Sequence, residues 1–127
     1  MAIYRKGIKG KLDALFSLYI RIRDKWTCRR CHKPQPYKSR GYHCAHFKRR
    51  GIQATCWDPT NAVGLDHGCH KYLDEHPAEK KKWFIAEFGE EAWEILTAKA
   101  NTTKQWRDYE IADLIKEYEA KISALTN

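Results

Sequence analysis

The spacing of apolar side chains predicts helices at both ends of the chain. Over residues 12–25, apolar positions recur every three or four residues, which is the period of a helix with one buried face. Residues 78–88 and 90–100 are predicted to form two further helices, because Gly89 between them is a common helix stop. A last helix is expected over residues 106–125. Its apolar stripe consists of Ile111, Ile115, Tyr118, Ile122 and Leu125.

The middle of the chain has no helical period. Prolines and glycines interrupt residues 26–60, where histidine, cysteine and basic residues are dense. Residues 42–47 and 61–65 are each predicted to form a short strand. Helical propensity returns at about Gly68 and is expected to end at Pro77, since proline lacks the amide that would continue a helix.

These elements predict an α+β fold in a single domain spanning residues 1–127, a length that suits one hydrophobic core. Residues 1–11 are basic and contain glycine, and we expect them to form a flexible arm. Residues 12–77 would hold the first helix and a strand–strand–helix core. Residues 78–127 would form a helical tail.

The charge balance points to a polyanionic partner. The formal net charge is +8 and the sequence pI is about 9.3, so DNA is the first expectation and an anionic membrane surface the second. The sequence shows no apolar run of transmembrane length and no signal-peptide pattern. We therefore expect a soluble cytoplasmic protein without a membrane partner.

Cysteine spacing predicts a structural Zn²⁺ site. Cys28 and Cys31 form a CxxC pair, in which two thiolates can share one tetrahedral ion. The segment Asp66-His67-Gly68-Cys69 stands where a second pair would, and Cys69 is the expected third ligand. Disulfides are not expected in a reducing cytosol. The candidates for the fourth ligand are Asp66, His67 and Cys56.

A second group of polar residues is interleaved with the zinc ligands and suits phosphodiester hydrolysis. His43 and His46 precede Asn61, and His70 follows Cys69 directly. A neutral imidazole can take a proton from water, and a divalent cation can neutralise charge on the phosphate and the leaving oxygen. The asparagine amide could orient either the imidazole or a loop. His70 and Asp74, four residues apart, would share one helix face and suit two metal ligands.

Three segments in this order carry a family resemblance: the CxxC, the stretch CAHFKRRG, and the stretch WDPTNAVGLDHGCHKYLDE. Together they resemble the HNH (ββα-metal) endonucleases of phages, and more closely the NinG/Rap recombination endonucleases. The resemblance implies a zinc-stabilised ββα-metal core and an endonuclease that acts on DNA, including branched recombination intermediates. It also implies a phage protein working in the cytoplasm of a bacterial host.

Carried over by position, the resemblance makes His46 the general base, Asn61 the middle residue of the motif, and His70 a ligand of a catalytic metal. That metal would be Mg²⁺ or Mn²⁺, with Zn²⁺ or Ni²⁺ as further options. The chain departs from the family pattern at two positions. Ala45 stands where a metal ligand often precedes the base, so His43 or Asp74 would have to be the second ligand. Asp66 stands where the zinc site usually has a cysteine.

Basic residues surround the proposed site and are expected to contact DNA phosphates, which gives affinity that falls with salt and reads little sequence. They are Arg29, Arg30, Lys48, Arg49 and Arg50. The basic run of residues 80–82 is assigned no role.

Two other interpretations remain open. One is a catalytically inactive, zinc-stabilised DNA-binding module, and the other is a zinc protein that contacts other proteins through its helical tail. A homodimer is also possible, because the stripe of the last helix could pack on a second copy instead of within the monomer.

Overall fold

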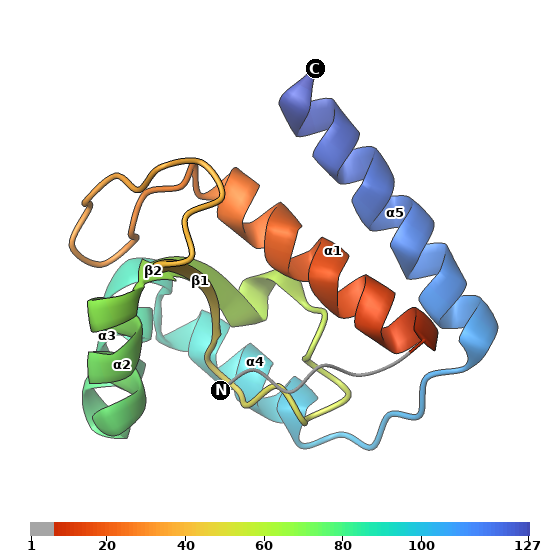
Figure 1. Cartoon of the computed structure of the whole chain (residues 1–127). Coiled ribbons are helices and arrows are strands. Elements are labelled where there is room, and N and C mark those ends of the chain that lie inside the picture. The colour runs from red at the N-terminus through yellow and green to blue at the C-terminus, as the bar shows by residue number, and fades with distance from the viewer. Residues whose placement is uncertain (1–6) are drawn as a thin grey trace.

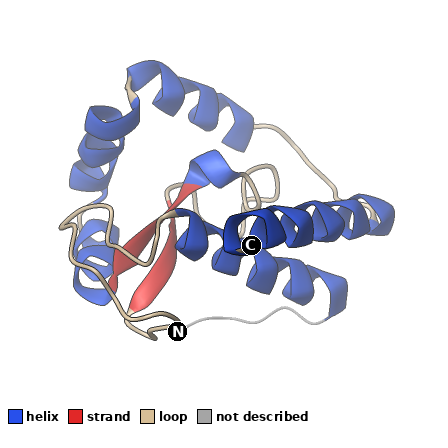
Figure 2. Cartoon of the chain, turned by 90° about the horizontal axis from the view of Figure 1, so that it is seen from above, coloured by secondary structure: helices blue, strands red, loops and turns tan. Residues whose placement is uncertain are grey.

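In the computed structural model, which describes residues 7–127, the chain forms five α-helices around a two-stranded antiparallel sheet (Figures 1 and 2). In chain order the elements are α1 (Gly7–Arg23), β1 (Tyr42–His46), a 3-10 turn η1 (Pro59–Asn61), β2 (Ala62–Asp66), α2 (His67–Glu75), α3 (Pro77–Phe88), α4 (Glu90–Ala100) and α5 (Asp108–Thr126). The expected α+β class is thus confirmed, and each predicted helix and strand is present. Among the helices of residues 7–127, none is long and apolar enough to cross a membrane.

The hairpin of β1 and β2 separates two groups of buried side chains. Its register pairs Tyr42 with Asp66 and His46 with Ala62. Because side chains alternate along a strand, Cys44 and His46 face α1, whereas His43 and Ala45 face α2. Neighbouring residues of one strand therefore belong to different environments.

The first buried cluster lies between α1, α5 and the segment before β2, and α1 and α5 lie side by side (Figure 1). It contains Leu12, Phe16, Ile20, Cys56, Trp57, Ala62, Ile111, Ile115 and Tyr118. The second cluster lies between the sheet and α2, with Phe47 and Trp83 packed against it. It contains Cys28, Ala45, Val63, Leu65, Cys69 and Leu73.

The N-terminal helix differs from the prediction at both ends. The expected arm over residues 1–11 is wrong for residues 7–11, which form the first turns of α1; residues 1–6 lie outside the described part of the chain. The start of α5 lies beside these turns (Figure 1), so tertiary packing outweighs the cost of about 1 kcal/mol for a glycine inside a helix. At the other end α1 stops at Arg23, because Lys25 and Trp26 have positive φ angles.

The stripe of the last helix packs within the chain and not on its outer surface. Ile111, Ile115 and Tyr118 are buried in the first cluster, whereas Leu125 is 52% exposed. Asn61, expected to open the second strand, belongs instead to η1, where the carboxylate of Asp58 caps the turn by accepting from the amide of Thr60 at 2.9 Å.

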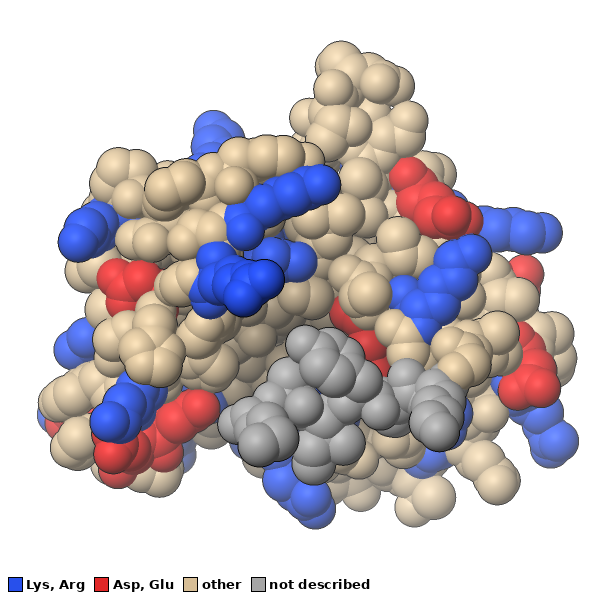
Figure 3. Space-filling view, in the orientation of Figure 1, with Lys and Arg blue, Asp and Glu red and all other residues tan. Residues whose placement is uncertain are grey.

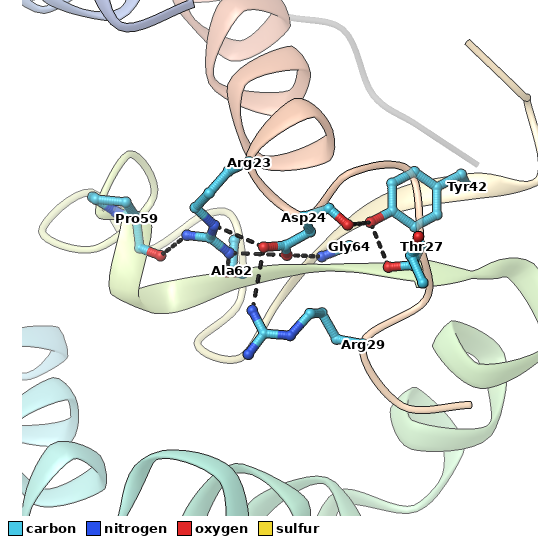
Figure 4. A network of polar contacts seen from close by, with 8 residues as sticks. All are labelled: Arg23, Asp24, Thr27, Arg29, Tyr42, Pro59, Ala62 and Gly64. Carbon is cyan, nitrogen blue, oxygen red and sulfur yellow. Dashed lines mark hydrogen bonds and ion pairs between the residues drawn. The ribbon is translucent and has the colours of Figure 1, made fainter. Parts of the chain in front are cut away.

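A buried carboxylate joins the end of α1 to the sheet (Figure 4). The side chain of Asp24 is only 3% exposed; it accepts from Arg23 Nε at 2.9 Å and Nη2 at 3.0 Å, and from Arg29 Nη1 at 3.2 Å. Its fourth donor is the backbone amide of Gly64 in β2, at 2.8 Å. Arg23 in turn donates to the carbonyl oxygens of Pro59 and Ala62, each at 2.8 Å. The charge is therefore paired and hydrogen-bonded on all sides, as burial requires.

Gly64 also lets an aromatic ring lie directly over β2. The hydroxyl of Tyr42 donates to the carbonyl of Thr27 at 2.9 Å, and its ring atoms occupy the space where a Cβ on residue 64 would stand. A side chain at this position would displace either the ring or the strand.

We predict that Gly64→Ala lowers the free energy of unfolding by about 1–3 kcal/mol or more, because overpacking in a core forces such shifts. Gly41→Ala is the control, since its added Cβ would meet nothing closer than 3.6 Å. Urea unfolding followed by circular dichroism measures both. Equal stability of the two variants would contradict the close approach of Tyr42.

Candidate metal centre and active site

Three thiols and one carboxylate converge next to the sheet. Cys28 and Cys31 lie in the turn after α1, Asp66 ends β2, and Cys69 lies in the first turn of α2. One potential ligand atom from each lies within 4.8 Å of the others. We call these four residues the thiol–carboxylate cluster. Their donor set and spacing fit a structural Zn²⁺ ion.

Backbone contacts place the CxxC turn against β2. The backbone amide of Cys28 donates to the carbonyl oxygen of Lys33 at 3.0 Å, and the backbone amide of His32 donates to the carbonyl oxygen of Cys28 at 2.8 Å. The amide of Arg29 donates to the carbonyl of Gly64 at 3.0 Å. The turn is therefore attached to the strand that ends in Asp66.

The two carboxylate oxygens of Asp66 have different partners. Its Oδ1 accepts from the amide of Cys69 at 2.7 Å and so caps the start of α2. Its Oδ2 accepts from the thiol of Cys31 at 2.9 Å and points into the cluster. Of the three candidates for the fourth ligand, only Asp66 lies in the cluster. His67 lies against the ring of His43, and Cys56 belongs to the first buried cluster.

Two thiols of this cluster, those of Cys31 and Cys69, have raised pKa values and so keep their protons when no cation is present. The hydrogen bond to Asp66 raises the pKa of Cys31, and burial raises the pKa of Cys69 to about 12. Burial also tends to raise the pKa of Asp66, but the hydrogen bonds from Cys31 and Cys69 outweigh it and lower that pKa. A bound dication would convert the thiols to thiolates, so metal binding releases protons.

A second group lies between β1 and α2. The Nδ1 atoms of His43 and His70 face each other at 2.8 Å, and Nε2 of His70 lies 3.2 Å from Oδ2 of Asp74. Oδ1 of Asp74 accepts from the ammonium of Lys80 at 2.7 Å. His43 and Ala45 lie two residues apart on β1, so their side chains share the face of the sheet that packs against α2, where Ala45 is buried. His43 therefore contacts His70 from a regular strand.

The two nitrogens of His70 have different partners, which separates the expected roles of His43 and Asp74. A cation between the two Nδ1 atoms would have His43 and His70 as ligands. Asp74 would then accept from Nε2 of His70, the arrangement in which a carboxylate orients a metal-bound imidazole. Burial lowers the pKa of His70, which favours the neutral ring that a cation needs.

His46 lies on the opposite face of β1 and makes no contact with His70 within residues 7–127. Its ring lies 5.6 Å from that of Phe16, and its Nε2 is 3.0 Å from the carbonyl oxygen of Cys56. Because a carbonyl can only accept, Nε2 carries a proton. The lone pair of the neutral ring is then on Nδ1. Burial lowers the pKa of His46 and keeps the ring neutral near pH 7.

Asn61 orients a loop and not an imidazole. Its Oδ1 accepts from the amide of Lys48 at 2.7 Å, while its Nδ2 donates to the carbonyls of Lys48 and Thr55, each at 3.0 Å. The side chain is fully buried. These three bonds hold together the ends of the segment that follows His46.

The residues expected to contact DNA differ in how far their side chains already contact other groups of the protein. Arg29 is paired with Asp24, and Arg30 donates to Cys69 Sγ at 3.5 Å while lying over the ring of Tyr72. Lys48 lies 4.0 Å from the ring centre of Trp93, Arg50 pairs with Asp13 at 3.3 Å, and Arg49 is exposed. Figure 3 shows basic side chains spread over one face, densest left of centre, with acidic ones mostly at the lower left and right.

No pattern in the sequence distinguishes Lys80 or Asp24 from other charged residues. Lys80 reaches Asp74 only because α3 packs against α2, and Asp24 meets its partners through the docking of α1 on β2. The one signal available for Asp24 was a charged residue near the end of the helix predicted over residues 12–25, and such residues are common on surfaces.

Comparison with protein-family models, with curated proteins and with solved structures found no match for this chain. The function of the protein is therefore inferred from the geometry of the two groups of residues described above.

The thiol–carboxylate cluster predicts one tightly bound Zn²⁺ per chain, whose removal by a chelator lowers the melting temperature. Asp66→Asn should weaken zinc binding at least about tenfold, because the amide still caps α2 but loses the anionic ligand. Asp66→Cys should restore it. The control is His32→Asn, since His32 lies in the same turn outside the cluster. Competition with a chromogenic chelator measures the affinities, and unchanged binding in Asp66→Asn would contradict the site.

Burial of His46 predicts a pH-dependent contribution to stability. The folded pKa is lowered and the unfolded value is about 6.5, so the unfolded chain binds the proton more readily. The free energy of unfolding should therefore fall as the pH drops below about 6.5. In His46→Gln this fall should be smaller, which urea titrations at several pH values would reveal. Parallel pH profiles of the two proteins would contradict the burial of a neutral ring.

Proposed function

We propose that this protein is a metal-dependent DNA endonuclease of the HNH (ββα-metal) type, close in kind to the NinG/Rap recombination endonucleases. The observation that carries the proposal is the pair of imidazoles at 2.8 Å between β1 and α2. It lies directly beside the thiol–carboxylate cluster, since Cys69 and His70 are consecutive. A structural metal group, a hairpin and a helix with facing histidines are the parts such a nuclease needs.

In this proposal His43 and His70 hold the catalytic cation, and Asp74 orients His70 through Nε2. A divalent cation there would supply charge neutralisation for the scissile phosphate and the leaving oxygen. Imidazole nitrogens suit Zn²⁺ and Ni²⁺, whereas Mg²⁺ and Mn²⁺ would need additional oxygen ligands from water and phosphate. His43 thus takes the role that the residue at position 45 has in the family pattern.

His46 is the proposed general base. Its Nε2 proton is engaged by the carbonyl of Cys56, which fixes the tautomer and leaves the lone pair on Nδ1. The neutral ring can accept the proton of a water molecule as that water attacks phosphorus. Asn61 supports this step indirectly, because it holds the backbone of Lys48, two residues after His46.

Basic side chains next to the imidazoles suit a phosphate backbone. Lys48, Arg49 and Arg50 follow His46 directly, and the chain carries a net charge of +8. Such contacts are strongly salt-dependent and largely independent of sequence. Arg29 and Arg30 contribute positive charge to this region, and their guanidinium groups also contact other side chains of the protein. Arg29 pairs with Asp24, and Arg30 contacts Cys69 and Tyr72. Branched recombination DNA is the proposed substrate on the basis of the family resemblance.

A zinc-stabilised DNA-binding module without catalysis is the second candidate. One observation favours it: Ala45 is buried where the family pattern often has a metal ligand. In that case the thiol–carboxylate cluster and the basic residues would be needed, and His43, His46 and His70 would not.

The test is cleavage of supercoiled plasmid and of a synthetic four-way junction with Mg²⁺, Mn²⁺, Ni²⁺ or Zn²⁺. We expect metal-dependent nicking that His46→Ala lowers by about 10²–10⁴-fold, the usual contribution of a general base, with DNA affinity retained. His43→Ala should lower cleavage and catalytic-metal affinity together. His32→Asn serves as the control histidine.

Absence of cleavage by the wild-type protein with every cation, together with salt-sensitive DNA binding, would reject the nuclease in favour of the binding module. Nicking that survives in both His46→Ala and His43→Ala would instead place the active site elsewhere.

A further inference from the structure

One lysine of α3 differs from its neighbours. Lys80 is partly buried, with a side chain 16% exposed, whereas Lys81 and Lys82 on the same helix are exposed. Its ammonium lies 2.7 Å from Oδ1 of Asp74, on the carboxylate that also contacts His70. Ordering a lysine side chain in this way costs conformational entropy, and an ion pair with an exposed carboxylate such as Asp74 offsets little of that cost.

The contact with Asp74 places this ammonium next to the proposed metal ligands. Oδ1 of Asp74 accepts from Lys80, and Oδ2 of the same carboxylate lies 3.2 Å from Nε2 of His70. The other ring nitrogen of His70, Nδ1, faces Nδ1 of His43 at 2.8 Å. Lys80 is therefore separated from the proposed cation site by one carboxylate and one imidazole.

We infer that Lys80 contacts the scissile phosphate and stabilises the charge that develops on it during cleavage. This inference rests on the proposed nuclease function. A phosphate bound by a cation at His43 and His70 would lie one imidazole ring away from the Asp74 carboxylate that holds Lys80.

The chemistry of the side chain fits this role. An ammonium group has three donors, of which the Asp74 bridge uses one, so two remain for phosphate oxygens. Asp74 is 50% exposed, and a bridge to such a carboxylate is weak enough to exchange for a phosphate. Without DNA the bridge holds the ammonium in place. With DNA bound, Asp74 can keep its contact with His70.

The experiment compares Lys80→Met, Lys80→Arg and the matched control Lys82→Met, each in the full zinc-loaded chain. Single-turnover cleavage of the plasmid at saturating protein is measured, with binding of the same DNA in Ca²⁺. We expect Lys80→Met to cleave about 10²–10³-fold more slowly, the usual loss of one transition-state donor. Lys80→Arg should recover part of the rate and Lys82→Met should match wild type. Both methionine variants should lose DNA affinity equally, since each removes one charge.

A second readout separates phosphate contact from mere support of Asp74. Mn²⁺ binding to the zinc-loaded protein is measured by calorimetry without DNA. Removing a positive charge next to the metal site should leave the Mn²⁺ affinity of Lys80→Met equal to or higher than that of wild type. A parallel loss of Mn²⁺ affinity and cleavage would overturn the inference and make Lys80 a support for Asp74.

The remaining outcomes are equally decisive. Equal cleavage by Lys80→Met and Lys82→Met, in a wild-type protein that does cleave, would overturn the role of Lys80 alone. A wild-type protein that cleaves with none of the cations would overturn the proposed function and this inference with it.

Discussion

The arrangement of the whole molecule depends on one buried carboxylate. Asp24 accepts from two arginines and from the backbone of β2, so it fixes the end of α1, the start of the CxxC turn and the middle of the sheet relative to each other (Figure 4). Removing one partner of a buried ion pair commonly costs 3–5 kcal/mol, because the other charge stays buried. That cost makes the three elements a single unit, and it brings Cys28 and Cys31 to within reach of Asp66.

The thiol–carboxylate cluster and the proposed active site are coupled through the first turn of α2. Asp66 caps this helix with one oxygen and faces Cys31 with the other, while Cys69 and His70 lie on consecutive residues. A metal bound by the thiol–carboxylate cluster would therefore fix the rotation of α2 and the direction of His70. Such small ββ elements are not stable alone, which explains why the thiol–carboxylate cluster and flanking helices surround this hairpin.

Because side chains alternate along a strand, the two histidines of β1 lie in different surroundings. His43 faces α2, where a second imidazole meets it, and His46 faces α1, where burial keeps it neutral and a carbonyl fixes its tautomer. Two histidines three residues apart in one strand thus acquire different surroundings, one suited to a cation and one to a proton. Lys80, from α3, is joined to the side of His43 and His70 through the carboxylate of Asp74.

Local rules in the sequence determined the helices and strands, the α+β class and the three cysteines of the thiol–carboxylate cluster, because periodicity and short spacings are properties of neighbouring residues. Tertiary structure alone decided that α1 begins at Gly7, that Asp66 completes the cluster, that Asn61 holds a loop, and that Asp74 and His43 meet different nitrogens of His70. Each of these depends on register or helix docking between segments distant in sequence. Their relative position follows from the summed packing of the domain, which no local pattern encodes.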